Sequence, residues 1–494
     1  MYLFIVYNCN NDITMNSIAR YIGIMILSVL LVACNEEAGF SSSPSLRLEF
    51  SSDTITFDTI FAEVGSPTAA ITVRNPNGDG VRIKGVSLAG GDSSFFNVLV
   101  DGQYGEYMSD LEIRAKDSIL VLASVYPQKG KKEQPLMLSD SLVFTLESGV
   151  QQFVALLAYS REVTFMRGVE LETDTALAPG HYVVYDSLVV GENAKLSIPR
   201  STTLYFHDKA YLRVKGTLDV AGVPGAPVVM RGDRTDNMFS YLPYDRIPGQ
   251  WGGVIFTATS NNNNLVHCDI HSASFGVKVE KGDTVVQRIS IESSKIHNFH
   301  GNALELVMSR ATVRNSLFAN SQGNCVKIVG GNVEFVHCTI ANFYVWKQRD
   351  VALALYNSYE GEPAPLGYAL FDNCVVLGSK DDEVMGYFVD YGDSIPHSLN
   401  YRFVNSLLNT VEADDTCFVN VEYDSRDNEI FGDGHFRLVD NSIFMYDFHL
   451  SDVSSARGKA SDSYLHVMPY DIDGVLRESG SVDAGCYQYV PERD

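Results

Sequence analysis

Residues 231–246 gather more chemically versatile side chains than any other stretch of this chain. They include three aspartates, three arginines and two tyrosines, and they interrupt two strand-like segments. Guanidinium groups make forked hydrogen bonds to hydroxyls, and tyrosine rings stack on flat sugar faces. Long excursions of this kind are more often functional than short connections. We therefore expect a ligand-binding loop that uses Arg231, Asp233, Arg234, Asp236, Tyr244, Asp245 and Arg246. The alternative is that these charges pair with one another and only hold the loop.

A second candidate region, residues 343–359, is rich in aromatic and basic side chains. It holds Tyr344 and Trp346, with Lys347 and Arg349 close by, and Trp346 is one of two tryptophans in the chain. Exposed aromatic rings flanked by basic groups can stack on sugars, but the same residues can cover apolar surface without any ligand. Tyr344 and Trp346 are thus candidate ligand contacts, and both interpretations stay open.

Six short segments around these loops share one pattern, which predicts the fold that positions them. Each has a His, Asn or Ser, then a small Cys or Ser, then an apolar residue two positions further on. The small residues are Cys268, Ser294, Ser316, Cys338, Cys374 and Ser406. The steps from 294 to 316 and from 316 to 338 are both 22 residues, and the others are longer. Short strands repeating at this period predict stacked coils of a parallel β-helix, with the small residues inside and loops inserted on one side.

Five histidines lie on or beside these segments. His267 and His337 occupy the position before the small residue, where we expect stacked hydrogen-bonding side chains rather than ligands. His271, His297 and His300 lie outside that position. A proton-transfer role for His297 or His300 would need a carboxylate or an arginine on the neighbouring coil.

The segments Leu212–Leu218 and Gly249–Phe256 carry a family likeness. The order Gly-Thr-Leu, then Gly-Gln-Trp-Gly-Gly-Val-Ile, resembles bacterial right-handed parallel β-helix proteins of the pectate-lyase superfamily. The resemblance covers residues 170–490. At its end, residues 471–477 and 482–488 resemble the closing element of such proteins, with Cys486 and Gln488 in place of the usual Ala and Glu. This implies a structural cap that protects the open coil end.

Residues 46–165 show a different pattern, with alternating runs such as Ala70–Val73 and Ser141–Leu146 separated by turn residues. Period-two strands with regular turns predict an antiparallel β-sandwich. The segments Phe57-Asp58, Val73-Arg74-Asn75, Phe96-Asn97-Val98 and Gln151–Leu156 resemble immunoglobulin-like domains of cilia-associated and bacterial surface proteins. The predicted fold class is therefore all-β: an immunoglobulin-like β-sandwich followed by a right-handed parallel β-helix.

The N-terminal segment predicts export. Arg20 precedes an apolar run over residues 21–30, and Leu31-Val32-Ala33-Cys34 follows directly. The run is too short to span a bilayer comfortably. We take Met15 as the start of translation, because it places Arg20 near the N-terminus.

The Leu-Val-Ala-Cys box resembles the bacterial lipoprotein signal, which implies cleavage after residue 33 and acylation, including palmitate, of Cys34. Residues 34–45 then form a tether, and the protein's membrane contact is its lipid anchor. Position two of the mature chain is not Asp, which favours the outer membrane. The pair Glu36-Glu37 resembles the surface-export signal of Bacteroidetes lipoproteins, although Lys or Ser is usual there.

Composition limits the partners. The net charge is −24, which argues against nucleic acid and anionic bilayers as partners. Three of the eight cysteines share the small-residue position with serine, and no Cys-x-x-Cys pair exists, so we expect neither disulfides nor a thiolate metal site. No cofactor is predicted.

The remaining question is whether the chain is an enzyme. Lyases on this fold use a basic residue with calcium-binding acids, and glycosidases use two or three placed carboxylates. Asp269, Glu292 and Asp372 share no common position in the repeat, and the acidic runs 381–383 and 414–415 fit solvated loops. We assign no catalytic residue and no metal ligand. The expected function is noncatalytic carbohydrate binding or cell-envelope adhesion, with a polysaccharide lyase or glycoside hydrolase as the alternative.

Overall fold

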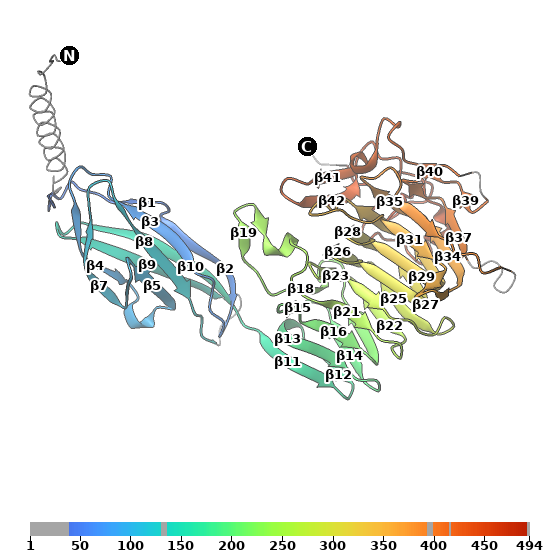
Figure 1. The fold of residues 1–494 in the computed structure, drawn as a ribbon, viewed down its shortest axis with the longest axis horizontal. Helices are drawn as coiled ribbons and strands as arrows, with labels where there is room; N and C mark the ends of the chain where they lie inside the picture. The colour runs from blue at the N-terminus through green and yellow to red at the C-terminus, as the bar shows by residue number, and fades with distance from the viewer. Residues whose placement is uncertain (1–38, 130–135, 393–398, 414–415, 492–494) are drawn as a thin grey trace, which may run out of the picture. The chain divides into compact units, whose positions relative to one another are not determined.

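The computed structural model describes residues 39–129, 136–392, 399–413 and 416–491, which divide into two units between Arg161 and Glu162 (Figure 1). In these ranges the regular structure is strand, with short 3-10 turns such as η1 (Gly91–Ser93), η4 (Gly432–His435) and η5 (Asp462–Tyr464). Cys34 and the rest of the predicted signal lie outside the described residues. No helix in the described part of the chain is long and apolar enough to cross a membrane.

The first unit contains two five-stranded sheets around one apolar core. One sheet has the order β1 (Glu49–Phe50), β3 (Ala69–Arg74), β8 (Ser118–Val125), β5 (Phe96–Val100) and β6 (Gln103–Tyr104). The other has the order β2 (Thr54–Phe61), β10 (Gln151–Arg161), β9 (Leu136–Leu146), β4 (Val81–Leu88) and β7 (Tyr107–Ile113). Pairing is antiparallel except between β2 and β10. Alternate residues such as Ile71 and Val73 are buried, as the period-two pattern predicted.

The second unit contains a 26-stranded sheet whose pairings are all parallel, from β11 (Thr164–Leu171) to β40 (Glu422–Tyr423). The parallel sheet begins earlier than the predicted start at residue 170, because β11 already pairs with β13. Strands pair with counterparts one coil away in three parallel series, as expected of a parallel β-helix. Apolar residues from all three series form one continuous core.

The three series are distinguished by their strands. The first, which carries the candidate site, runs through β11, β13 (Gly180–Val190), β15 (Thr202–Phe206), β18 (Val228–Gly232), β23 (Cys268–His271), β26 (Lys295–Phe299), β28 (Leu317–Ser321), β30 (Thr339–Asn342), β35 (Val375–Gly378), β38 (Leu407–Leu408) and β40. The second runs through β11, β13, β16 (Tyr211–Val214), β21 (Gly253–Phe256), β24 (Val277–Val279), β27 (Leu304–Arg314), β29 (Val326–Val336), β31 (Leu353–Tyr356) and β36 (Val384–Tyr387). The third runs through β12 (Thr175–Ala176), β14 (Lys195–Pro199), β17 (Thr217–Ala221), β22 (Asn263–Val266), β25 (Gln287–Glu292), β27, β29, β34 (Leu366–Asp372), β37 (Leu399–Val404) and β39 (Phe418–Val419).

The small residues of the repeat point inward, as predicted. All six are buried, and several link adjacent coils: the backbone N–H of Cys268 donates to Ser294 Oγ at 3.1 Å, and that of Ser294 donates to Ser316 Oγ at 3.1 Å. The six described cysteines are all free thiols. A side chain of this size fits where the backbone turns from one strand series to the next.

The residue before each small residue adopts a left-handed backbone conformation. His267, Ser293, Asn315, His337, Asn373 and Asn405 all have φ between 44° and 56°. Asn and His tolerate this region better than most residues, which explains why they recur there. Their side chains also bond across coils, for example Asn373 Nδ2 to His337 Nε2 at 2.9 Å.

Trp251 anchors the segment that resembles the pectate-lyase superfamily. Its ring is fully buried and stacks on Phe206 at 4.3 Å, and its Nε1 donates to the carbonyl of His271 at 2.8 Å. Gly253 follows with φ of 124°, where a Cβ would lie 2.2 Å from the carbonyl oxygen of Phe275. Glycine is therefore required at this position.

Residues 432–491 form a cap that includes the hairpin of β41 (Phe436–Asp440) and β42 (Met445–Leu450) (Figure 1). Its apolar residues, among them Phe436, Phe448 and Ile472, pack on outward side chains of β28, β30, β35 and β38. The cap thus covers one side of four successive coils, which corrects the expectation that it protects the coil end. Asp471 and Asp483 are buried acceptors of backbone N–H groups and hold the cap's own turns.

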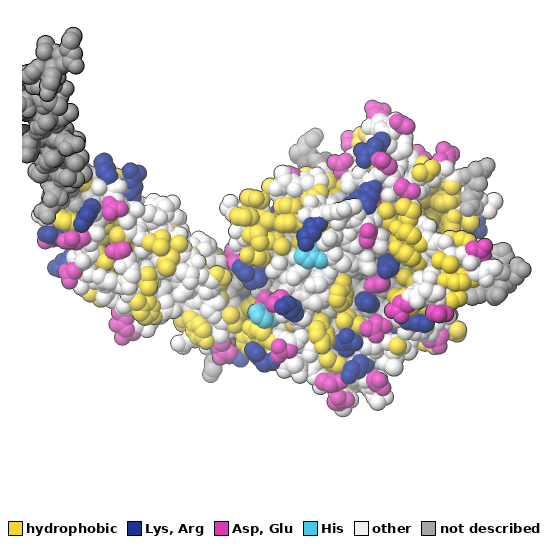
Figure 2. All heavy atoms as spheres, viewed as in Figure 1, with side chains coloured by type: hydrophobic (Ala, Val, Ile, Leu, Met, Phe, Trp, Pro, Cys, Tyr) yellow, Lys and Arg dark blue, Asp and Glu magenta, His cyan; other side chains and the backbone are white. Residues whose placement is uncertain are grey.

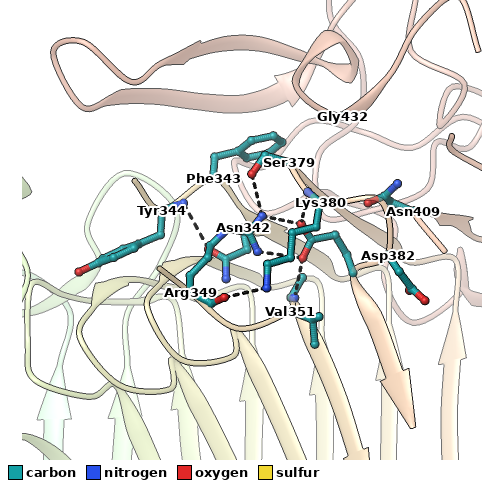
Figure 3. Close-up of polar contacts among 12 residues, drawn as sticks. Asn342, Phe343, Tyr344, Arg349, Val351, Ser379, Lys380, Asp382, Asn409 and Gly432 are labelled. Atoms are coloured by element: carbon teal, nitrogen blue, oxygen red, sulfur yellow. Dashed lines mark hydrogen bonds and ion pairs between the residues drawn. The ribbon is translucent and has the colours of Figure 1, made fainter. Parts of the chain in front are cut away.

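One acidic residue predicted to be solvated is instead fully buried. Glu383 accepts two hydrogen bonds from Arg349, at 2.5 and 3.0 Å, and two from the backbone N–H groups of Ala352 and Lys380. Figure 3 shows Arg349, Ser379 and Lys380 converging in this network, in which Lys380 Nζ donates to the carbonyl of Arg349 at 2.7 Å. A buried carboxylate persists because a guanidinium group and two N–H groups replace its hydration.

Candidate functional site

The outward side chains of the first strand series change character midway along the coils. On β23 and β26 they are Asp269, His271, Lys295 and His297, and the register pairs Asp269 with Lys295 and His271 with His297. One coil later, Leu317 and Ala319 occupy the same two positions. The cap covers the apolar positions, whereas Asp269, Lys295 and His297 stay partly exposed and His271 is buried among its partners. In Figure 2, histidines reach the surface of the second unit beside basic and acidic side chains.

We define the polar patch as Arg231, Asp245, Asp269, His271 and His297. His271 lies at its centre: Nδ1 donates to Asp269 Oδ1 at 2.7 Å, and Nε2 donates to Asp245 Oδ1 at 2.8 Å. His297 Nε2 contacts the same Asp269 oxygen at 3.1 Å, and Arg231 Nη2 lies 2.9 Å from Asp245 Oδ1. Basic and acidic groups therefore alternate along the patch, and the two imidazoles stack with their centroids 5.0 Å apart.

The charges in this patch reinforce one another. Burial opposes protonation of His271, but Asp269 and Asp245 outweigh it and raise its pKa to about 10. Burial likewise opposes ionisation of Asp245, but His271 and Arg231 lower its pKa to about 2. Burial raises and the two histidines lower the pKa of Asp269, which lies well below its usual value. At neutral pH the patch therefore holds an imidazolium between two carboxylates.

The predicted loop reaches this patch through two of its residues. Arg231 is the penultimate residue of β18, and Asp245 belongs to the 3-10 turn η2 (Tyr244–Arg246) that follows the hairpin of β19 (Asn237–Phe239) and β20 (Leu242–Pro243). The loop folds back so that Asp245 lies over His271, on a strand more than twenty residues further along the chain. The structure thus joins predicted loop residues to histidines that had no predicted carboxylate partner.

The other predicted loop residues are paired within the protein. Asp233 accepts from His207 Nδ1 at 2.7 Å, and Arg234 forms a forked pair with Asp236 at 2.5 and 2.7 Å. Arg234 also lies over the ring of Tyr244, 3.8 Å from its centroid. Arg246 Nη1 donates to the carbonyl of Ile443 at 3.4 Å. The interpretation that the loop's charges hold it in place therefore describes most of these contacts.

The two predicted aromatic residues differ in exposure. Tyr344 is 4% exposed, so its ring presents little surface to a ligand in this structure. Trp346 is 37% exposed and stacks on Phe444 of the cap hairpin at 4.1 Å. Because Arg246 contacts Ile443, both predicted regions contact the same turn of the cap.

Two further exposed rings lie at the hairpin of β19 and β20. Phe239 and Tyr241 are 54% and 50% exposed, and their rings stack at 5.8 Å. They form a flat apolar surface on the same loop that supplies Asp245. Rings of this kind suit stacking on the faces of sugars.

A second histidine group connects the cap to β26. His449 lies between Asp447 and Asp473, at 2.5 and 2.9 Å, and Lys295 Nζ lies 3.2 Å from Asp473. Burial lowers and these two carboxylates raise the pKa of His449, to about 9. A cleft of about 180 Å³, lined by Asp269, Lys295 and Asp473 among others, lies beside this contact.

The central residues of the patch, Asp269, His271 and His297, were not predicted as site residues. A usable signal existed: they occupy the first and third positions after the small residue of each repeat, where side chains alternate outward. Those positions are charged or His in two coils and mostly apolar in the next four. The change from polar to apolar marks where the cap begins.

Comparisons with known proteins identify no family. No protein-family model matches the chain, and no curated protein matches its sequence. Solved structures match parts of it. A Porphyromonas gingivalis protein of unknown function is 16% identical over 26% of this chain and 50% of its own, with a TM-score of 0.19. The match thus spans about half the length of that protein.

Two other solved structures match a similar share of this chain. The ASH/PapD-like domain 7 of human CEP192 is 14% identical over 25% of this chain and 90% of its own, with a TM-score of 0.17. A family 123 glycoside hydrolase from Clostridium perfringens, described as hydrolysing glycolipid glycans, is 10% identical over 24% of this chain and 30% of its own, with a TM-score of 0.17. None of these likenesses carries a functional conclusion.

Proposed function

We propose that this protein is a lipid-anchored outer-membrane protein, exposed on the cell surface, whose second unit binds carbohydrate without cleaving it. In this proposal Cys34 carries the lipid, and the first unit is an immunoglobulin-like module between the tether and the binding unit. The second unit is a right-handed parallel β-helix of the pectate-lyase type. The sequence motifs described above support these assignments.

The observation that carries the binding proposal is the uncovered polar patch. The cap buries the outward side chains of β28, β30, β35 and β38, yet the same strand series keeps Asp269 and His297 partly exposed on β23 and β26. Partly exposed carboxylates and imidazoles, held in place by their partners, can exchange hydrogen bonds with sugar hydroxyls at little entropic cost.

The loop over residues 233–246 adds stacking groups beside the patch. Phe239 and Tyr241 present exposed rings, and Arg234 lies flat on Tyr244 with its charge already paired to Asp236. A site that combines rings with fixed polar groups is typical of carbohydrate recognition. Trp346 offers a further partly exposed ring.

The test is a glycan array with the purified protein, followed by incubation with any bound polysaccharide and analysis for cleavage products. We expect binding without products. Arg234→Ala, Tyr241→Ala and Trp346→Ala should each weaken binding about tenfold, which equals about 1.4 kcal/mol. The control is Tyr104→Ala, which removes an exposed ring of the first unit and should leave binding unchanged.

Two outcomes would contradict the proposal. Equal binding by these three variants and the wild type would place the ligand elsewhere, and silence on the array would favour an adhesion role that needs no glycan. A carbohydrate-active enzyme is the second candidate, because carboxylates of Asp245 and Asp269 flank His271 in a solvent-reachable patch. Cleavage products that disappear in Asp269→Asn would establish that alternative.

A further inference from the structure

We propose that Asp269, His271 and His297 form a binding site for a divalent transition metal, with zinc as the physiological type of ion. The proposal does not depend on carbohydrate binding. It rests on the positions of three side chains from two adjacent coils and on the groups that hold them.

The three side chains converge as metal ligands do. One oxygen or nitrogen atom from each lies within 4.8 Å of the others, the sole such group of three His, Cys, Asp or Glu residues found in the described part of the chain. Asp269 Oδ1 lies 2.7 Å from His271 Nδ1 and 3.1 Å from His297 Nε2. Zinc bonds of about 2.0–2.2 Å to N and O ligands require ligand atoms roughly 3 to 3.5 Å apart, so small side-chain movements would admit the ion.

The strand register places these three ligands beside one another. Asp269 and His271 are two positions apart on β23, so both point outward, and the parallel register sets His297 beside His271. Metal binding would displace the proton between His271 Nδ1 and Asp269. Two imidazoles with one carboxylate favour zinc, nickel or copper, whereas calcium prefers six to eight oxygens.

A second layer of contacts already orients the central histidine. His271 Nε2 donates to Asp245, and Arg231 in turn holds Asp245. Metal-binding histidines characteristically donate their other nitrogen to a carboxylate, which fixes the ring and its tautomer. Asp269 and His297 side chains are 29% and 27% exposed, so an ion can reach them from solvent, and water or a ligand can fill the remaining positions.

The cluster around His449 provides a matched comparison. There, too, one histidine lies between two carboxylates, Asp447 and Asp473, but among the described residues these side chains do not belong to a group of three ligand atoms within 4.8 Å of one another. Lys295 instead brings a positive charge to Asp473, which disfavours a cation. A structural ion-pair cluster and a metal site can therefore be distinguished within one protein.

The test is isothermal titration of ZnCl₂ into the full chain after treatment with a chelator. We expect one site per chain, which His297→Gln and Asp269→Asn each weaken more than about tenfold, while Asp245→Asn weakens it about 10- to 100-fold. His449→Gln should bind zinc as the wild type does. Circular dichroism and the fluorescence of buried Trp251 verify that each variant is folded.

Cobalt gives a second readout, because the visible absorption of bound Co²⁺ reports its coordination by protein nitrogen and oxygen. That absorption should appear in the wild type and in His449→Gln and disappear in His297→Gln. Zinc affinity that is absent in the micromolar range, or that is equal in the wild type and Asp269→Asn, would overturn the proposal. So would a loss of binding in His449→Gln alone.

Discussion

Replacing Glu383 by glutamine removes a charge from the interior of the second unit with little change in shape. Glu383 is 0% exposed, and its partner Arg349 has a side chain that is 5% exposed. Glutamine keeps an acceptor for one or two of the four hydrogen bonds but leaves the guanidinium group buried and unpaired. Breaking a buried ion pair on one side costs about 3–5 kcal/mol. We expect the free energy of unfolding of the second unit to fall by that amount.

Tryptophan fluorescence during urea unfolding measures this selectively, because both tryptophans of the chain, Trp251 and Trp346, belong to the second unit. With a slope of about 3 kcal/mol per molar urea, the midpoint should fall by about 1 to 1.7 M. The control is Asp381→Asn, two residues away. The Asp381 carboxylate is 80% exposed and pairs with Arg426, so its loss should cost less than about 1 kcal/mol.

A double variant separates the cost of an unpaired buried charge from the cost of changing the two side chains. Arg349→Met combined with Glu383→Gln leaves no unpaired charge, so it should be less destabilised than the sum of the two single variants. Equal midpoints for Glu383→Gln and Asp381→Asn would refute the reasoning. Equal midpoints would mean that the groups around Arg349 stabilise its charge without the Glu383 carboxylate.

Three further predictions concern other parts of the chain. Cys34→Ala should abolish lipid labelling and membrane fractionation, and unchanged labelling would exclude Cys34 as the anchor. Cys338→Ser should unfold near the wild-type midpoint, whereas Cys338→Arg should not fold, because burying an unpaired charge costs several kcal/mol; thiol labelling of the native protein should reach half-buried Cys417 before Cys338. Because the carboxylates raise the pKa of His271 from 6.5 to about 10, its protonation stabilises the fold fully below pH 6.5 and progressively less up to pH 10. Urea midpoints should therefore fall between pH 7 and pH 10 in the wild type and fall less in His271→Gln; parallel pH profiles would contradict this.

The all-β class and the inward ladder could be predicted because each depends on local residue types. A small residue at the same position of six coils, such as Ser294 or Ser316, is buried directly after a residue with a left-handed backbone, and it is visible from its own residue type. The apolar residue two positions later, such as Ile296 or Phe318, is buried for the same reason. Strand alternation of this kind repeats often enough to be visible without knowing which strands pair.

The polar patch could be predicted only in part because its members come from different coils. Arg231 and Asp245 were expected from the loop's composition, but the partner of Asp245 is His271, which lies on the following strand of the same series. That contact depends on how the loop folds back, and no local pattern specifies it. Glu383 illustrates the same limit. Its acidic neighbours predicted a solvent-exposed side chain, but its partner Arg349, 34 residues earlier in the chain, holds it in the interior.

The cap was expected from its motifs, but its place on the fold was not. Asp471 and Arg477 are buried among contacts within the cap and with Asn315, so they act as the structural elements that the motif implied. The cap that they hold together packs on the outward residues of β28, β30, β35 and β38. The repeat shows that these outward positions are mostly apolar, but it does not show which segment of the chain covers them.

The position of the cap has a consequence for how the chain folds during synthesis. The strip formed by Leu317, Ala319, Ala341, Val375 and Leu377 is synthesised before the residues that shield it, which follow about sixty or more residues later in the chain. Until Phe436, Phe448 and Ile472 have been synthesised and packed, the coils expose an apolar surface on which other chains can associate. A chain that stops before residue 432 would lose the residues that cover this apolar strip. Loss of the segment from residue 432 onward should therefore cause aggregation rather than only a shorter chain.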